Sequence, residues 1–242
     1  MITQAIALRT PPVKPFRPRL LPFTYEKRIE LAAELRIPAT YEEYIQYVCD
    51  CDYRLQYHDG HIISFIEYDE QTNAIMGEAA PIHERLVMRM ALLIGQLLDF
   101  RTEGRRYAIF GSNIKIYIPN YNKSYNPDMA VALEPAQFIK HKPKKRTVTS
   151  LVNPHIVVEV MSKGTRDFDK YEKLPNYKKI DSVQQIIFIE PSEVNISTFI
   201  RVSANEWRNL DFTSVNDNLP IVGENTIPVK DIYNYLILLG KE

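Results

Sequence analysis

The fold of this chain is decided by the stretch HIVVEVM at residues 155–161. An unbroken apolar run is typical of a strand buried on both faces, whereas a half-exposed strand alternates apolar and polar residues. We therefore predict a central strand here. Its one charged residue is Glu159, which by strand alternation shares a face with Val157 and Met161. Two interpretations stay open: an edge strand with Glu159 in solvent, or a buried metal ligand or catalytic acid.

The buried interpretation needs a second carboxylate, and Asp128 is the candidate. It opens the predicted strand 128–133 directly after Asn126-Pro127. Taken alone, this is also what an ordinary strand-initiating turn looks like, because proline restricts the entry into the strand. Two carboxylates at adjacent strand ends would form a hard oxygen site suited to Mg²⁺, with substrate phosphate oxygens completing the shell.

A cation follows on the next predicted helix, residues 169–180. Asp169, Lys173 and Tyr177 are spaced by four residues and therefore lie on one face. Asp169 with Glu172 also fits a capping box, and a solvated helix face with an i,i+4 ion pair remains the simpler alternative. Pro175 should kink this helix or delay its start.

The remaining pattern predicts one mixed α/β layer domain over residues 24–242, preceded by an extended proline-rich arm over residues 1–23. An Asp59-Gly60 turn indicates a β-hairpin, because these residues accept the positive φ angles of a tight turn. The other predicted helices span 24–35, 41–49 (capped by Thr40 and Glu43), 81–100 and 228–239; the other predicted strands span 53–57, 61–67, 107–110, 114–118, 185–190, 194–202 and 207–212.

The composition restricts the class of protein. The 242 residues hold 45% hydrophobic and 11% aromatic residues, which argues against a disordered chain. No run approaches the roughly 20 apolar residues of a membrane helix, so we expect no membrane partner. The two cysteines, Cys49 and Cys51, are expected to be reduced thiols of a cytoplasmic protein.

Positive charge is local rather than global. Lys+Arg and Asp+Glu both number 30, so bulk electrostatics does not favour nucleic acid. The basic run 140–146 connects the two carboxylate strands, however. We therefore expect it to protrude near the site, together with basic residues of the arm. A solvated loop is the alternative. Tyr121 and Tyr125 before Pro127 are candidates for stacking on bases.

The ordered set Pro127-Asp128, Glu159-Val160-Met161-Ser162, Thr165, Asp169, Lys173 and Tyr177 resembles the Uma-type restriction endonuclease family of the PD-(D/E)xK nuclease superfamily. The resemblance runs from about residue 41 to residue 190. It also covers residues 54–60, which are similar to the family's opening hairpin, and His83, placed where a histidine commonly begins its long helix.

This resemblance implies a restriction-endonuclease-like fold, a mixed central β-sheet flanked by helices. It implies that Asp128 and Glu159 hold Mg²⁺, or Mn²⁺ as a substitute, helped by the main-chain carbonyl near Val160. Lys173 would assist the attacking water, with Lys170 as the fallback. DNA is the implied substrate, and a homodimer is one option, since many such nucleases cut both strands as dimers.

Two positions depart from the pattern. The superfamily's usual lysine lies two residues after the glutamate, where this chain has Met161, and the hairpin often carries a glutamate where this chain has Gln56. Glu84 beside His83 is a candidate replacement for that third carboxylate. These departures keep alternatives open: a catalytically silent nuclease-like module that binds DNA or protein, or a hydrolase of RNA or of another phosphodiester.

Overall fold

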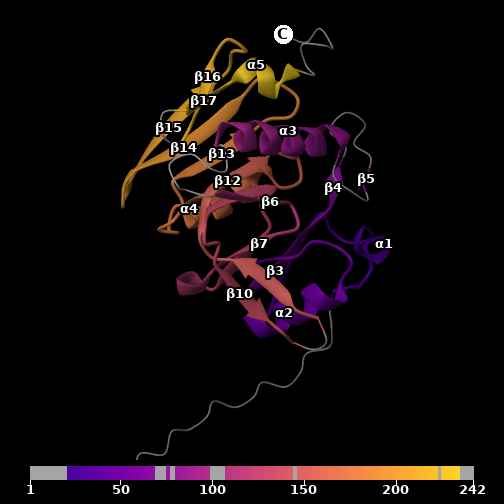
Figure 1. Cartoon of the computed structure of the whole chain (residues 1–242). Helices are drawn as coiled ribbons and strands as arrows, with labels where there is room; N and C mark the ends of the chain where they lie inside the picture. Colours follow the sequence, from indigo (N-terminus) through magenta and orange to yellow (C-terminus); the bar gives the residue numbers. More distant parts are fainter. Residues whose placement is uncertain are drawn as a thin grey trace, which may run out of the picture.

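Two β-sheets packed face to face form the body of the protein (Figure 1). The computed structural model of the chain describes residues 21–68, 75–76, 80–98, 107–143, 146–222 and 225–234. The remaining residues include most of the predicted arm and, from residue 235, the end of the predicted closing helix.

The first sheet has six strands in the order β15-β14-β13-β12-β9-β6, and β12 lies inside it. Strand β12 runs parallel to β13 and antiparallel to β9. The bounds are Tyr107–Gly111 (β6), Met129–Leu133 (β9), Pro154–Val160 (β12), Gln185–Ile189 (β13), Ile196–Ser203 (β14) and Glu206–Phe212 (β15). The central strand predicted from the apolar run is confirmed. Glu159 is only 1% exposed, so the edge-strand interpretation is wrong.

The second sheet has seven strands in the order β1-β3-β2-β8-β7-β11-β10. The bounds are Glu34–Pro38 (β1), Gln56–His58 (β2), His61–Phe65 (β3), Lys115–Ile118 (β7), Lys123–Tyr125 (β8), Phe138–His141 (β10) and Val148–Leu151 (β11). Two small pairs complete the strands: Glu67–Tyr68 (β4) with Ile75–Met76 (β5), and Asn218–Ile221 (β16) with Asn225–Pro228 (β17). Both large sheets mix parallel and antiparallel pairs, so the α/β class with mixed sheets and flanking helices is confirmed.

Two of the helices, α2 (Tyr41–Asp50) and α3 (Pro81–Leu97), each cover one of the large sheets. The bounds of the others are Tyr25–Arg28 (α1), Leu174–Tyr177 (α4) and Val229–Ile232 (α5), with a 3₁₀ turn at Pro119–Tyr121 and a π-helical segment at Phe168–Lys173. Figure 1 shows α3 lying across one face of the six-stranded sheet. Its buried residues, among them Leu86, Met90 and Ile94, pack on Ile156 and Val158 of β12.

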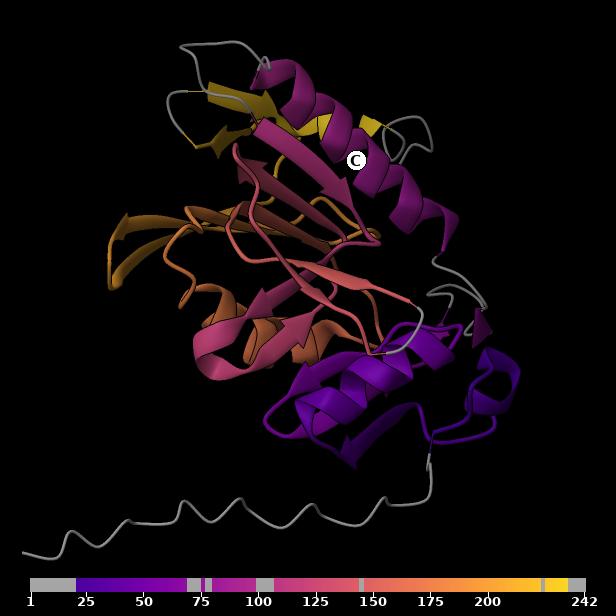
Figure 2. The same cartoon turned by 60° about the horizontal axis from the view of Figure 1, so that its bottom comes forward.

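The opposite face of the six-stranded sheet carries the site-bearing helix. Val157 and Met161 point to this side and pack with Phe168 and Tyr177. Isoleucine and tyrosine side chains of the seven-stranded sheet close the same core. Figure 2 shows α2 against that second sheet, at the end of the molecule away from α3.

Local signals for α2 and the hairpin are confirmed. The side chain of Thr40 accepts a hydrogen bond from the Glu43 N–H, and the Glu43 carboxylate accepts one from the Thr40 N–H, so the capping box is complete. Asp59 and Gly60 have φ angles of 46° and 76°. Both values are positive, as a two-residue hairpin turn between β2 and β3 requires.

The helix predicted over residues 24–35 is wrong. Only α1 forms, and the chain then enters β1, which pairs antiparallel with β3. The cause is Arg28, whose fully buried guanidinium donates to the carbonyls of Ala32 and Ala33 and to both oxygens of Ser64. These bonds hold residues 32–33 in an extended connection rather than a helical turn, and they depend on a partner 36 positions away.

A helical segment forms where the helix over residues 169–180 was predicted, but its first part is π-helical and it ends earlier, at Tyr177. The π-helical segment precedes α4, and Pro175 falls at the start of α4, where a missing N–H is tolerated. The predicted capping box is wrong, because Asp169 lies inside the helix and its carboxylate faces Thr165 and Lys173 instead. Of the predicted closing helix, the described part is α5 alone.

Two further features concern the protein's surroundings. Within the described ranges, no helix has the length and apolarity needed to cross a membrane. Cys49 and Cys51 are both buried and form no disulfide, as expected for reduced thiols.

Candidate active site

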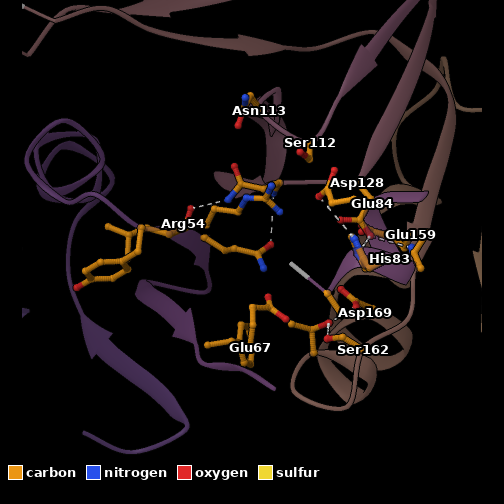
Figure 3. A pocket seen from close by; sticks show the side chains of 18 of the residues that line it. Arg54, Glu67, His83, Glu84, Ser112, Asn113, Asp128, Glu159, Ser162 and Asp169 are labelled. Atoms are coloured by element: carbon orange, nitrogen blue, oxygen red, sulfur yellow. Dashed lines mark hydrogen bonds and ion pairs between the residues drawn. The ribbon is translucent and has the colours of Figure 1, made fainter. Parts of the chain in front are cut away.

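A cavity of about 650 Å³ opens where the ends of β9 and β12 meet the π-helical segment and the loops around β2 and β4. Figure 3 shows Asp128, Glu159, His83 and Asp169 on one side of it and Arg54 on the other. The predicted site residues Asp128, Glu159, Val160, Asp169 and Lys173 all line this cavity. The tertiary structure therefore brings together residues that span 45 positions of the chain.

Asp128 and Glu159 come from neighbouring antiparallel strands. Met129 of β9 pairs with Val158 of β12, and because the strands are antiparallel, Asp128 just before β9 comes opposite Glu159 near the end of β12. The Val160 N–H donates to Oδ2 of Asp128 at 2.8 Å, which ties the two strand ends directly. Both carboxylates are buried at 8% and 1% exposure, and both line the cavity.

Lys173 is the buried cation of the site. Its Nζ lies 3.0 Å from Oε1 of Glu159 and 2.8 Å from Oδ1 of Asp169, and it donates to the carbonyl of Asn126 at 3.1 Å. Burial alone lowers the pKa of Lys173, but the surrounding carboxylates outweigh it and raise the pKa above its usual value. The side chain therefore remains an ammonium ion at neutral pH, and its role is electrostatic rather than that of a base.

Tyr177 adds a hydrogen bond on the same carboxylate. Its hydroxyl donates to Oε1 of Glu159 at 2.7 Å. Burial raises the pKa of Glu159 to about 8, against the opposing effects of Lys173 and Tyr177. The i,i+4 face predicted for Asp169, Lys173 and Tyr177 is confirmed, and the solvated alternative is wrong because all three side chains are buried.

His83 holds the other carboxylate. Its Nε2 lies 3.1 Å from Oδ2 of Asp128. Burial opposes the charged form of each partner, but their mutual interaction raises the pKa of His83 and lowers that of Asp128. The two therefore form an ion pair at the start of α3, and His83 fixes Asp128 through Oδ2, the same oxygen that accepts from the Val160 N–H.

A third carboxylate is present, but it is not the one considered from the sequence. Glu67 of β4 lines the cavity, and burial together with Asp128 raises its pKa. Glu84 also lines the cavity, yet its side chain is 48% exposed and stands 3.8 Å from Nδ1 of His83. The signal for Glu67 in the sequence was only an acid at the end of a predicted strand, which had no visible partner.

The donor set fits a small, hard divalent cation. Six acidic residues line the cavity, and four of them, Glu67, Asp128, Glu159 and Asp169, share it with Lys173 and His83 as basic partners, so carboxylate oxygens outnumber the cations beside them. Neither Oδ1 of Asp128 nor Oε2 of Glu159 accepts a hydrogen bond from a described residue. Within the described ranges no group of three or more His, Cys, Asp or Glu side chains encloses an ion by itself. Mg²⁺ tolerates this, because it binds through one or two carboxylates and keeps waters.

Several predicted features lie elsewhere. Lys170 stands 3.7 Å from Glu190 rather than near Glu159. The described part of the basic run does not line the cavity: Lys140 and His141 belong to edge strand β10, and Arg146 donates to the Cys49 carbonyl, while residues 144–145 lie outside the described ranges. Arg146 is held there because its guanidinium satisfies a carbonyl at the end of α2.

The tyrosines proposed for base stacking differ from each other. Tyr125 is fully buried, and its hydroxyl lies 2.6 Å from Nδ1 of His58, so it cannot stack on a base. Tyr121 is 46% exposed, and Lys179 lies over its ring. The basic residues of the arm, Lys14, Arg17 and Arg19, lie outside the described residues.

Comparison with known proteins agrees with the fold. An uncharacterized protein of Synechocystis sp., sll1609, is 26% identical over 144 residues, covering 57% of this chain and 76% of the relative. A second, slr1290, is 24% identical over 171 residues, covering 71% and 78%. Among solved structures, a chain titled "putative nuclease belonging to DUF820" from Anabaena variabilis has a TM-score of 0.51 at 15% identity, covering 71% of this chain and 91% of that one, which supports the fold.

The family is shown by a match that covers most of the chain. The model of the Uma2 family, described as "Putative restriction endonuclease", matches residues 41–229. This range includes every residue of the cavity's carboxylate side. The resemblance seen in the sequence is thereby confirmed, and the chain belongs to the Uma2 family.

Proposed function

We propose that this protein is a Mg²⁺-dependent endonuclease that hydrolyses phosphodiester bonds of DNA. The observation that supports the proposal most directly is one buried cluster: Lys173 bridges Glu159 and Asp169, while Asp128 faces the same cavity. A cavity in which carboxylate oxygens surround the fixed ammonium of Lys173 suits the cleavage of a phosphate ester better than the binding of an anion alone.

In this proposal Asp128 and Glu159 are the metal ligands, with the main-chain carbonyl of Val160 as a third oxygen. When bound, Mg²⁺ supplies positive charge against the phosphodiester under attack and makes a nearby water more acidic. Mn²⁺ is expected to substitute, since it prefers the same oxygen donors.

In this proposal the side chains around the site position the two metal-binding carboxylates and supply positive charge. Tyr177 and Lys173 both bind Oε1 of Glu159 and so leave Oε2 directed to the ligand side. The ammonium of Lys173 also provides fixed positive charge where negative charge develops on the phosphate, and it can orient the attacking water. His83 keeps Asp128 ionised and fixed.

The test is cleavage of supercoiled plasmid by the full chain with Mg²⁺, with Mn²⁺ and with EDTA. Asp128→Asn and Glu159→Gln should abolish nicking while circular dichroism stays unchanged, and Lys173→Met should slow it about 100-fold or more. Glu206→Gln, which changes an exposed acid of β15, is the matched control and should keep full activity. Metal-dependent cleavage that survives in both acid variants would remove these residues from the mechanism.

A second candidate is a catalytically silent module that binds DNA or protein. It is favoured by Met161, which is buried in the core where the superfamily's usual lysine would stand, and by Gln56 in the cavity wall. Calorimetry separates the two candidates. The module predicts DNA binding without divalent-metal binding, whereas the nuclease predicts that Mg²⁺ or Mn²⁺ binds and that Glu159→Gln weakens this binding.

The type of nucleic acid and the oligomeric state can be tested in the same way. RNA offered as competitor or substrate decides between DNA and RNA, and sedimentation of the protein on a duplex decides whether a homodimer forms. The two cysteines form no disulfide, which agrees with a reducing, cytoplasmic location; that location remains a prediction.

A further inference from the structure

The wall of the cavity opposite the carboxylates is cationic. Arg54, just before β2, and Lys115, at the start of β7, both line it. Figure 3 shows Arg54 on the side away from Asp128 and His83. Neither residue stood out in the sequence, because each is a single basic residue beside a strand.

Lys115 has no carboxylate partner among the described residues. Its Nζ donates to the Leu55 carbonyl at 3.1 Å and to Oδ1 of Asn126 at 2.8 Å, which leaves one of its three N–H groups. Both acceptors are neutral. Burial, and then the positive charge of Arg54, lower the pKa of Lys115 to about 7.

Arg54 is held by even less. Its exposed side chain makes no hydrogen bond or ion pair with any residue that the structure describes. A guanidinium presents five N–H donors in a planar fork that matches two oxygens of a phosphate. The described residues therefore leave the N–H donors of Arg54 available for a ligand in the cavity, although the charge of the Glu67 carboxylate also acts on it.

Two cations placed close enough to repel each other are stabilised when an anion lies between them. We propose that Arg54 and Lys115 form a clamp for a phosphate of the polynucleotide other than the one at the carboxylates. The inference rests on the proposed function. The clamp supplies a second phosphate contact, so that the polynucleotide lies across the cavity with another of its phosphates at Asp128 and Glu159.

Arg54 gives the cleaner test, since it supports no other described residue, whereas Lys115 also braces Asn126 next to the Pro127-Asp128 turn. Binding of a fluorescent 20-base-pair duplex is measured by anisotropy in EDTA, where no cleavage occurs, over a series of salt concentrations. Arg54→Gln should weaken binding about 10-fold and reduce the slope of log K against log salt by about 0.9, the value for one phosphate contact. Arg208→Gln, an exposed arginine on β15, removes the same charge outside the cavity and should change neither quantity.

The outcomes distinguish the clamp from the nuclease activity. Plasmid cleavage by the wild type with Mg²⁺, together with unchanged affinity and salt slope in Arg54→Gln, would overturn the clamp and leave the nuclease proposal standing. Absent cleavage with weakened binding in Arg54→Gln would support the clamp on a silent module. Lys115→Gln should weaken binding as Arg54→Gln does, and its urea unfolding curve shows whether the loss reflects a misplaced Asn126 instead, which would exclude Lys115 from the clamp.

Discussion

Replacing Lys173 by methionine isolates the electrostatics of the buried cluster. The substitution keeps the length of the side chain and its apolar stem but removes the ammonium. Two carboxylates, Glu159 and Asp169, then lose their ionic partner, and the carbonyl of Asn126 loses a donor. All of these groups are less than 10% exposed, so water cannot replace the contacts freely.

The expected cost follows from this burial. Removing one partner of a buried ion pair destabilises a protein by about 3–5 kcal/mol, because the other charge is left buried and unpaired. The variant can relieve part of this cost by binding a proton. Burial already raises the pKa of both Glu159, to about 8, and Asp169, and loss of Lys173 removes the charge that opposes this rise.

The sign of the pH dependence is therefore fixed. A carboxylate whose pKa is higher in the folded than in the unfolded state binds more protons when folded, so its contribution to stability is present at low pH and lost as pH rises. Wild-type Glu159, with a pKa of about 8, already holds this proton below pH 8, so the penalty of Lys173→Met should grow by about 1.4 kcal/mol per pH unit only above roughly pH 8. The penalty should thus be smaller and nearly constant below pH 8 and largest at the alkaline end.

Urea unfolding in EDTA at pH 6.5, 8 and 9.5 measures this directly. Lys170→Met is the matched control on the same helix. Its side chain is 39% exposed and its ammonium lies 3.7 Å from Glu190, so it should cost less than about 1 kcal/mol at every pH. A loss of under 1 kcal/mol for Lys173→Met at pH 9.5, or a loss at pH 9.5 no larger than at pH 6.5, would refute the reasoning.

Two further substitutions test the surroundings of the site. Tyr177→Phe removes the donor to Glu159 without changing the packing of the ring; unfolding should become about 1–2 kcal/mol easier and plasmid nicking slower, and equal nicking rates would show that this hydroxyl does not position the carboxylate. Gly164→Ala places a Cβ 2.8 Å from the carbonyl oxygen of Ile66, so its melting temperature should fall by several degrees, whereas Gly111→Ala, whose Cβ meets nothing within 4 Å, should melt within about two degrees of the wild type.

The local elements were readable from the sequence because their causes are local. The capping residues of α2 lie three positions apart, and the Asp59-Gly60 turn needs only the φ angles that these residues accept. The central strand was visible because an apolar run can be satisfied only by burial on both faces. The same strand then identified Glu159 as a buried acid, and the order of Asp128, Glu159 and Lys173 pointed to the family.

Other elements depended on distant partners. The spacing of Ile29, Ala32 and Leu35 suits a helix over residues 24–35, but the end of this segment joins β1 because β3 offers a strand to pair with and because Arg28 binds Ser64. Its misassignment shows the limit of periodicity in a short segment, where contacts between residues far apart in the sequence outweigh local preference.

The sequence by itself determined which residue types could carry the chemistry, since it shows both a carboxylate within an apolar strand and a lysine on the helix that follows. Only the tertiary structure decided what surrounds them. It placed His83 on Asp128, added Glu67 to the carboxylates and set Arg54 beside Lys115 on the facing wall. Charges act through space, so their effect on one another depends on the distances that the folded sheets impose and not on their separation along the chain.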